Sequence, residues 1–193
     1  MIARILTLLV FSAGWIPVFR YRSEHLTTKL RAASSAEQRW IPITVVVVSF
    51  HISLTQLLIT LPLVGLAPEP ATDERPRFLL GVAIYLVGLA LWFWTRRSLG
   101  PLDRFVDTVS PPTRLLVTGP FGLVRHPLAL GTLLCALGPA VAADALVTWL
   151  TLVASAFCLA QRCLQDEEVL WAVFGDAYGA YAARTHRLIP LVW

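Results

Sequence analysis

Long apolar segments, broken by short polar connections, dominate this chain and restrict what it can fold into. Five of them occupy residues 2–19, 40–67, 78–95, 128–143 and 145–160. A helix needs about 20 apolar residues to cross the hydrocarbon core of a bilayer, and the first three segments come close to that length or exceed it. With 56% hydrophobic and only 15% charged residues, the chain is too apolar for a soluble domain. We therefore expect an all-α integral membrane protein with about five transmembrane helices.

The last two apolar segments are the shortest. Each has a helical rise of only about 24 Å, and Asp144 alone separates them. We expect a short helical hairpin, with Gly138-Pro139 interrupting its first arm, that returns the chain to the side it left. From residue 161 the chain becomes polar, and an amphipathic helix on the cytoplasmic face is expected there. One face of this helix carries Glu167, Leu170, Phe174, Tyr178 and Tyr181 at helical spacing.

The chain divides into two regions of different character. Residues 1–97 contain three apolar segments, of which the first two carry no usable signature, so we expect three N-terminal membrane helices. Residues 98–193 contain the longest connection, the predicted hairpin and the polar tail. Loops as long as residues 98–124 are often functional. The second region is therefore expected to carry the function.

Basic residues are distributed unevenly among the connections, and this distribution predicts the orientation. If the connection after the first segment is inside, thirteen of the sixteen Lys and Arg residues lie inside, and only Arg4, Arg75 and Arg77 lie outside. Cytoplasmic loops of membrane proteins carry such an excess. We expect the N-terminus outside and the polar tail inside, in a bacterial cytoplasmic membrane. A signal peptide is the alternative for residues 2–19, but the basic block that follows favours a retained anchor.

Other classes of protein fit the sequence poorly. The net charge of +4 arises from basic residues spread over the loops, without a basic stripe, so no nucleic-acid partner is expected. Cys135, Cys158 and Cys163 have neither zinc-type spacing nor the pattern of a secreted disulfide scaffold. We assign them a structural role and expect no metal site. His51, inside the second apolar segment, is interpreted as a helix-packing hydrogen bond.

Two charged clusters stand at the two ends of the predicted hairpin. Arg125-His126 precedes its first arm directly, and Asp166-Glu167-Glu168 follows its second. A charge next to an apolar run is costly unless it has a partner, which makes this pairing a site hypothesis. A polar cofactor arriving from the cytosol and an apolar substrate arriving from the lipid would meet there. Snorkelling anchors and structural ion pairs produce the same pattern and remain the alternative.

The C-terminal half also carries a recognisable series of short motifs. Its elements are Leu-Val-Thr-Gly-Pro-Phe at residues 116–121, Val-Arg-His-Pro at 124–127, Gly131, Glu167, Leu170, Phe174-Gly175, Tyr178, Tyr181, Arg187 and Pro190. This series resembles the C-terminal signature of a membrane methyltransferase superfamily. Its members include isoprenylcysteine carboxyl methyltransferases and phospholipid N-methyltransferases. The resemblance covers about residues 98–190 and does not resolve the substrate.

The resemblance implies S-adenosylmethionine as the cofactor, bound near the cytoplasmic face. The positions that it marks for cofactor binding are Arg125, His126, Pro127, Gly131, Glu167, Tyr178 and Tyr181, with Glu168 as the substitute for Glu167 if the register is off by one. These residue types suit the cofactor, because its carboxylate attracts Arg or His⁺ and its ribose hydroxyls or ammonium attract a carboxylate. Its sulfonium can rest against aromatic faces.

The implied reaction is direct in-line displacement of a methyl group by a carboxylate, thiol or amine of a lipidic or small hydrophobic acceptor. Positioning of the two reactants can itself lower the barrier. Arg187 would orient a substrate carboxylate or phosphate if the acceptor is an anion. Glu167 or His126 would be the base if it is an amine. Arg187, Glu167 and His126 are therefore the predicted catalytic residues.

One position departs from the superfamily pattern and keeps other functions open. The superfamily usually has a tyrosine two residues beyond the proline of Arg-His-Pro, where this chain has Ala129. This substitution implies a wider pocket or lost catalysis. A degenerate membrane helper or conduit of the same fold is therefore one alternative. A nicotinamide-dependent reductase is another, although membrane sterol reductases with a similar C-terminal pattern have many more spans.

Overall fold

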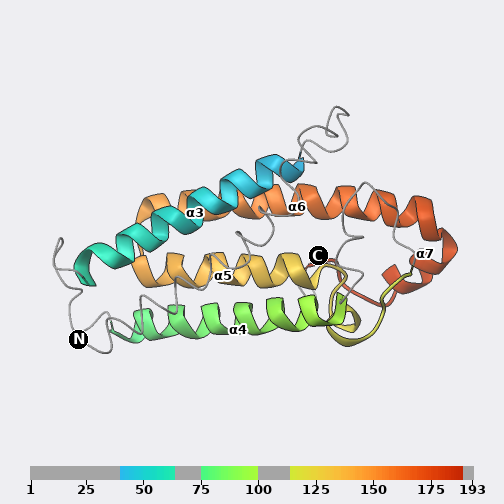
Figure 1. The fold of residues 1–193 in the computed structure, drawn as a ribbon, viewed down its shortest axis with the longest axis horizontal. Helices are drawn as coiled ribbons and strands as arrows, with labels where there is room; N and C mark the ends of the chain where they lie inside the picture. Colours follow the sequence, from blue (N-terminus) through green and yellow to red (C-terminus); the bar gives the residue numbers. More distant parts are fainter. Residues whose placement is uncertain (1–39, 64–74, 100–113, 189–193) are drawn as a thin grey trace.

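The chain forms a bundle of helices, and the computed structural model describes residues 40–63, 75–99 and 114–188 (Figure 1). The described elements are α3 (Trp40–Leu63), α4 (Arg75–Leu99), the short 3-10 helix η4 (Gly119–Gly122), α5 (Pro127–Ala143), α6 (Leu146–Phe174) and α7 (Asp176–Ala182). Over these residues no β-strand forms, and Val124 and His186 make a single isolated bridge. The all-α prediction is confirmed. The first apolar segment lies outside the described residues.

The four long helices run side by side. Helix α5 lies between α4 on one flank and α3 and α6 on the other (Figure 1). Helix α4 packs along α5, whereas α3 packs against both α5 and α6. The α4–α5 contact is close because glycines on each helix face the other. A Cβ atom on Gly138 would lie 2.5 Å from the Gly81 carbonyl oxygen, and one on Gly88 would lie 2.7 Å from the Cys135 amide nitrogen. Small residues that allow backbones to approach are typical of helix pairs in membranes.

The predicted interruption at Gly138-Pro139 is wrong. Helix α5 continues through Pro139 to Ala143. Proline lacks an N–H group, so it removes one hydrogen bond of the helix, and packed neighbours make this tolerable in a membrane protein. Gly138 serves the contact with α4 rather than a turn.

The second arm of the hairpin is longer than predicted. Helix α6 extends over 29 residues, well past the point where the apolar segment ends. Residues 161–174 contain no glycine or proline, so nothing in the sequence stops the helix until Gly175, which adopts a positive φ of 48°. The prediction that Glu167, Tyr178 and Tyr181 share one face of a single helix is also wrong. The two tyrosines lie on α7, beyond the break at Gly175.

Polar side chains join α3 to the hairpin inside the bundle. The fully buried His51 places Nδ1 at 2.8 Å from Thr151 Oγ1 and Nε2 at 3.0 Å from the Ala136 carbonyl oxygen. Because a carbonyl only accepts, Nε2 carries the proton. Thr44 donates to the Cys158 carbonyl oxygen at 3.2 Å. The helix-packing role predicted for His51 is thus confirmed.

The exposed surface of the bundle is strongly apolar. Helices α4 and α6 are each long and apolar enough to cross a membrane, and residues Ile43–Ile59 and Pro127–Ala143 are shorter apolar stretches. Exposed large side chains include Leu79, Leu86, Val87 and Phe93 on α4 and Leu150, Val153 and Phe157 on α6. Such an extended apolar surface indicates contact with lipid. Cys135, Cys158 and Cys163 are all free and buried.

A candidate active site at one end of the bundle

The two predicted charged clusters meet where α5 begins. The chain before α5 lies beside the segment that follows α7: the Arg125 amide donates to the His186 carbonyl oxygen at 2.8 Å, and the His126 amide donates to that of Arg187 at 3.0 Å. These backbone bonds bring the end of the described chain back to the start of the hairpin. Three segments far apart in the sequence therefore converge on one site.

Glu167, near the polar end of α6, lies at the centre of this site and is only 7% exposed. Its Oε1 accepts from Arg125 Nε at 2.9 Å and from His126 Nε2 at 3.3 Å. Its Oε2 accepts from Arg187 Nε and Nη2 at 3.0 and 2.8 Å. We call Arg125, His126, Glu167 and Arg187 the Glu167 cluster. Four of the predicted residues are thus brought together.

The cluster holds Glu167 in its ionised form. Burial alone would raise the pKa of its carboxyl, but the hydrogen bonds from His126 and Arg187 and the positive charges beside it lower that pKa well below the ordinary value. Arg125 is fixed further by Nη1, which donates to the carbonyl oxygens of Ala182 and Thr185 at 2.7 and 2.8 Å. This arginine therefore ties the segment after α7 to the start of α5.

The two predicted tyrosines support the cluster from α7. Tyr178 is fully buried, and its hydroxyl lies near Glu167 without a well-formed hydrogen bond. The Tyr181 hydroxyl donates to the Phe121 carbonyl oxygen at 2.7 Å and so attaches α7 to η4. Burial raises the pKa of both phenols, that of Tyr181 to about 12. Both tyrosines are therefore neutral near pH 7. Tyr178 packs within the site, and Tyr181 joins α7 to η4 through its hydrogen bond.

Two other predicted residues lie elsewhere. Glu168 is exposed and does not join the cluster. Gly131 faces α4, where an added Cβ would lie 3.0 Å from the Trp92 amide nitrogen. Gly131 therefore lies at a helix contact.

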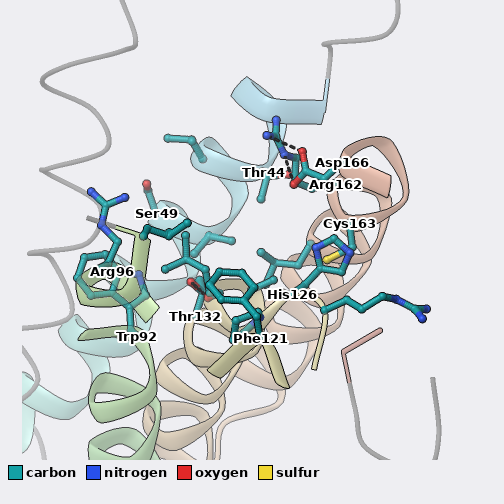
Figure 2. Close-up of a pocket in the computed structure, with 18 residues that line it drawn as sticks. Thr44, Ser49, Trp92, Arg96, Phe121, His126, Thr132, Arg162, Cys163 and Asp166 are labelled. Atoms are coloured by element: carbon teal, nitrogen blue, oxygen red, sulfur yellow. Dashed lines mark hydrogen bonds and ion pairs between the residues drawn. The ribbon is translucent and has the colours of Figure 1, made fainter. Parts of the chain in front are cut away.

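An apolar pocket of about 220 Å³ adjoins the cluster (Figure 2). It is lined by Thr44, Val45, Val48 and Ser49 of α3, Trp92, Arg96 and Leu99 of α4, Phe121 of η4, Arg125 and His126 just before α5, Pro127, Leu128, Ala129 and Thr132 of α5, and Leu159, Arg162, Cys163 and Asp166 of α6. Its volume is below the ~300–1,000 Å³ of typical small-molecule pockets, so it suits the reacting part of a ligand rather than a whole lipid.

The sequence prediction missed most of the pocket wall. Arg96 looks like an interface anchor, because it follows an aromatic end of an apolar segment. Arg162 pairs with Asp166 at 2.7 Å across one helical turn, a spacing that is visible in the sequence once this stretch is known to be helical. The α3 residues had no local signal. Ala129 does line the pocket and packs against Val48 and Leu159.

These features define a class, an all-helical and membrane-associated protein with a charged site beside an apolar pocket. The sequence model of the phospholipid methyltransferase family matches residues 76–177, slightly more than half of the chain, and the chain belongs to that family. The family is one of membrane methyltransferases, which confirms the resemblance. Curated proteins and solved structures gave no match. The matched region includes His126 and Glu167 but ends before Tyr178 and Arg187.

Proposed function

We propose that this protein transfers a methyl group from S-adenosylmethionine to a lipidic or small hydrophobic acceptor at the pocket beside the Glu167 cluster. The observation that carries the proposal is the position of His126, which both lines the apolar pocket and contacts the buried Glu167 carboxylate. The charged cluster suits a polar reactant and the pocket suits an apolar one, and His126 contacts both. The proposal includes a cytoplasmic location for this end of the bundle, with the N-terminus outside.

The side chains around the pocket suit the chemical groups of this cofactor. The aromatic residue Phe121 lines the pocket and would attract a sulfonium. His126 and the edge of Arg125 would attract its carboxylate. Asp166 lines the same wall and would accept from ribose hydroxyls or an ammonium group. We therefore assign cofactor contact to these residues and to Pro127.

The remaining cluster residues are proposed to act by positioning. Both Glu167 oxygens already accept hydrogen bonds, from Arg125 and His126 at Oε1 and from two nitrogens of Arg187 at Oε2. Glu167 is also a weak base, because its pKa is held low. In the proposed reaction Glu167 orients His126. If the acceptor is an amine, His126 is then the better candidate for accepting its proton.

The bound cofactor would supply an electrophilic methyl group and a neutral thioether as the leaving group. The chain would supply orientation, and its apolar walls at Val48 and Leu159 would exclude water from the reacting groups. Both contributions lower a displacement barrier without a covalent enzyme intermediate.

Calorimetric binding to the purified full chain tests the proposal. We expect saturable binding of S-adenosylmethionine, no comparable binding of a reduced nicotinamide dinucleotide, and at least about tenfold weaker cofactor binding in His126→Ala, equivalent to about 1.4 kcal/mol. The control variant is Glu168→Ala, which removes an exposed carboxylate beside the cluster. Binding of the nicotinamide alone would favour the reductase alternative. Binding of neither cofactor to folded protein would favour the degenerate helper.

A further inference from the structure

Glu167 is surrounded by more hydrogen-bond donors than it can accept. An ionised carboxylate has about four acceptor sites, two on each oxygen. Arg125 Nε and His126 Nε2 lie at Oε1, and two nitrogens of Arg187 lie at Oε2, so these sites are all taken. The hydroxyl of the fully buried Tyr178 lies near the same carboxylate and makes no well-formed hydrogen bond to any described residue. The cluster therefore holds one donor in excess.

A buried hydroxyl without an acceptor is unfavourable, because it has lost its hydrogen bonds to water and gained none in their place. Such groups are rare in folded proteins, and each calls for a specific explanation. A phenylalanine at residue 178 would fill the same space without this cost. We therefore expect the Tyr178 hydroxyl to find its acceptor in another state of the site.

The ring of Tyr178 is held beside Glu167. Trp171 of α6 and Tyr181 of α7 make edge contacts with this ring, at centroid distances of 5.4 and 6.0 Å. Helix α7 packs against the polar end of α6, which carries Glu167 (Figure 1). Burial raises the pKa of the Tyr178 phenol, so the hydroxyl keeps the proton that it would donate. The hydroxyl is thus placed to donate once an acceptor site on Glu167 becomes vacant.

His126 is the donor most easily released from Glu167. Its contact, at 3.3 Å, is the longest of the four. Arg125 is held in addition by two backbone carbonyl oxygens, and Arg187 binds through two nitrogens. His126 also lines the pocket, where a ligand would attract its imidazole. A ligand that engages His126 would therefore vacate one acceptor site on Glu167.

We propose that Tyr178 is a positioning residue that donates to Glu167 when His126 turns from this carboxylate to a ligand in the pocket. Glu167 presents His126 to the incoming ligand, and Tyr178 completes the hydrogen bonds of the carboxylate once His126 has moved. The carboxylate stays between Arg125 and Arg187 throughout, so the release of His126 costs little. This inference rests on the proposed function, in which the ligand is S-adenosylmethionine.

A double-mutant cycle on stability tests the exchange without any ligand. His126→Ala vacates the acceptor site permanently, so the Tyr178 hydroxyl should bond to Glu167 in that variant. We expect Tyr178→Phe to change the unfolding equilibrium constant by less than about twofold in the unmodified protein and by about tenfold in His126→Ala, equivalent to about 1.4 kcal/mol. Unfolding of the full chain in mixed micelles with increasing SDS measures this constant for the unmodified protein, both single variants and the double variant.

Tyr181→Phe is the matched control for this cycle, because the Tyr181 hydroxyl already bonds to the Phe121 carbonyl oxygen. It should change the unfolding constant by the same factor with His126 and without it. An equal effect of Tyr178→Phe in the two backgrounds would overturn the exchange. A tenfold effect of Tyr178→Phe in the unmodified protein would do so as well, since the hydroxyl would then be bonded before any ligand arrives.

Cofactor titration distinguishes a positioning role of Tyr178 from simple packing. Calorimetric binding of S-adenosylmethionine should be about three- to tenfold weaker in Tyr178→Phe, although this variant keeps the stability of the unmodified protein. The loss should disappear in the His126→Ala background, where no bond has to be released. Unchanged cofactor affinity in Tyr178→Phe would overturn the proposal. If the unmodified protein binds no cofactor while the stability cycle is non-additive, the proposed function fails and the exchange stands.

Discussion

Each end of the bundle contains an arginine paired with a carboxylate, and the two ends differ in burial. At the hairpin turn, Arg77 of α4 pairs with Asp144, to which Trp149 Nε1 also donates at 3.1 Å. The side chains of Arg77 and Asp144 are 36% and 40% exposed. At the other end, those of Arg125 and Glu167 are only 13% and 9% exposed.

This difference in burial indicates different roles. The pair Arg77–Asp144 is a surface ion pair between helices, whereas the Glu167 cluster has the burial expected of a functional site. An exposed pair contributes about 0–1 kcal/mol, because water and salt screen it. The charge of a buried carboxylate must be compensated, and Glu167 has the guanidinium groups of Arg125 and Arg187 and a hydrogen bond with His126 for that purpose. Groups whose pKa is displaced by burial and specific partners are enriched at functional sites. The difference in burial therefore favours the Glu167 cluster as the candidate functional site and a structural role for the ion pair at the hairpin turn.

Glu167→Ala should produce the largest effect. It leaves the partly buried guanidinium groups of Arg125 and Arg187 without their carboxylate, so we expect the free energy of unfolding to fall by about 3–5 kcal/mol. Unfolding in mixed micelles with increasing SDS measures this loss. Glu168→Ala, one residue along the same helix, should change stability by less than about 0.5 kcal/mol. Equal losses in both variants would contradict the distinction between buried and exposed charge.

Gly138→Ala should have the next largest effect. It tests whether the close contact between α4 and α5 supports both the stability of the bundle and the pocket at its buried end. The new Cβ would lie 2.5 Å from the Gly81 carbonyl oxygen, so α4 must move away from α5. Overpacking of this kind costs about 1–3 kcal/mol. Because α4 also carries Trp92 of the pocket, cofactor affinity should fall together with stability.

Gly122→Ala is the matched control for this contact. A Cβ at Gly122 would meet only the Val117 carbonyl oxygen at 3.6 Å, an ordinary distance. If Gly138→Ala proved as stable as this control, the close packing of α4 on α5 would not be needed for the stability of the bundle.

Tyr181→Phe should have a smaller effect, confined to the buried end. It removes a hydrogen bond to the Phe121 carbonyl oxygen and should cost about 0.5–1.5 kcal/mol. Tyr178→Phe is the control, because the Tyr178 hydroxyl makes no well-formed hydrogen bond. We expect the control to cost less in the same SDS titration. A larger cost for Tyr178→Phe would mean that its hydroxyl contributes to holding Glu167.

The buried end should also determine how stability depends on pH. The pKa of Glu167 is lowered from its ordinary value near 4.5, so its contribution is complete above that pH and is lost as the pH falls further. The pKa of Tyr181 is raised from 10.0 to about 12, so its contribution is complete below pH 10 and is lost between these values. Unfolding followed across pH should lose its acid slope in Glu167→Gln and part of its alkaline slope in Tyr181→Phe. Unchanged slopes would contradict these assignments.

The sequence predicted which segments are helical better than it predicted where each helix ends. Hydropathy located α4 within a few residues at each end, because its apolar run ends at charged residues. It placed the end of the hairpin near residue 160, whereas α6 continues to Phe174. Hydropathy reports the contact with lipid, but a helix ends where its backbone hydrogen bonding stops, here at Gly175.

The members of the Glu167 cluster could be predicted from the sequence, but their pairings could not. Arg125, His126 and Glu167 stand out because charges beside apolar runs are rare. Nothing in their spacing indicates that Arg187 binds Glu167 rather than a substrate, since that depends on how the segment after α7 returns to α5. Arg96 was overlooked because the same residue type anchors many helices at a membrane surface.

The smallest expected loss of stability is that of Asp144→Asn, at the exposed end of the bundle. This residue pairs with Arg77 and also adopts a left-handed backbone conformation with φ 43° at the turn between α5 and α6. Asp144→Asn removes the charge but keeps a residue type that tolerates this conformation, so we expect a loss of about 0–1 kcal/mol. Asp144→Ala removes the charge and adds backbone strain, so it should lose about 1–3 kcal/mol. If Asp144→Asn lost as much as Glu167→Ala in the same SDS titration, the ion pair at the turn would rival the buried cluster. Burial would then not explain the difference between the two ends.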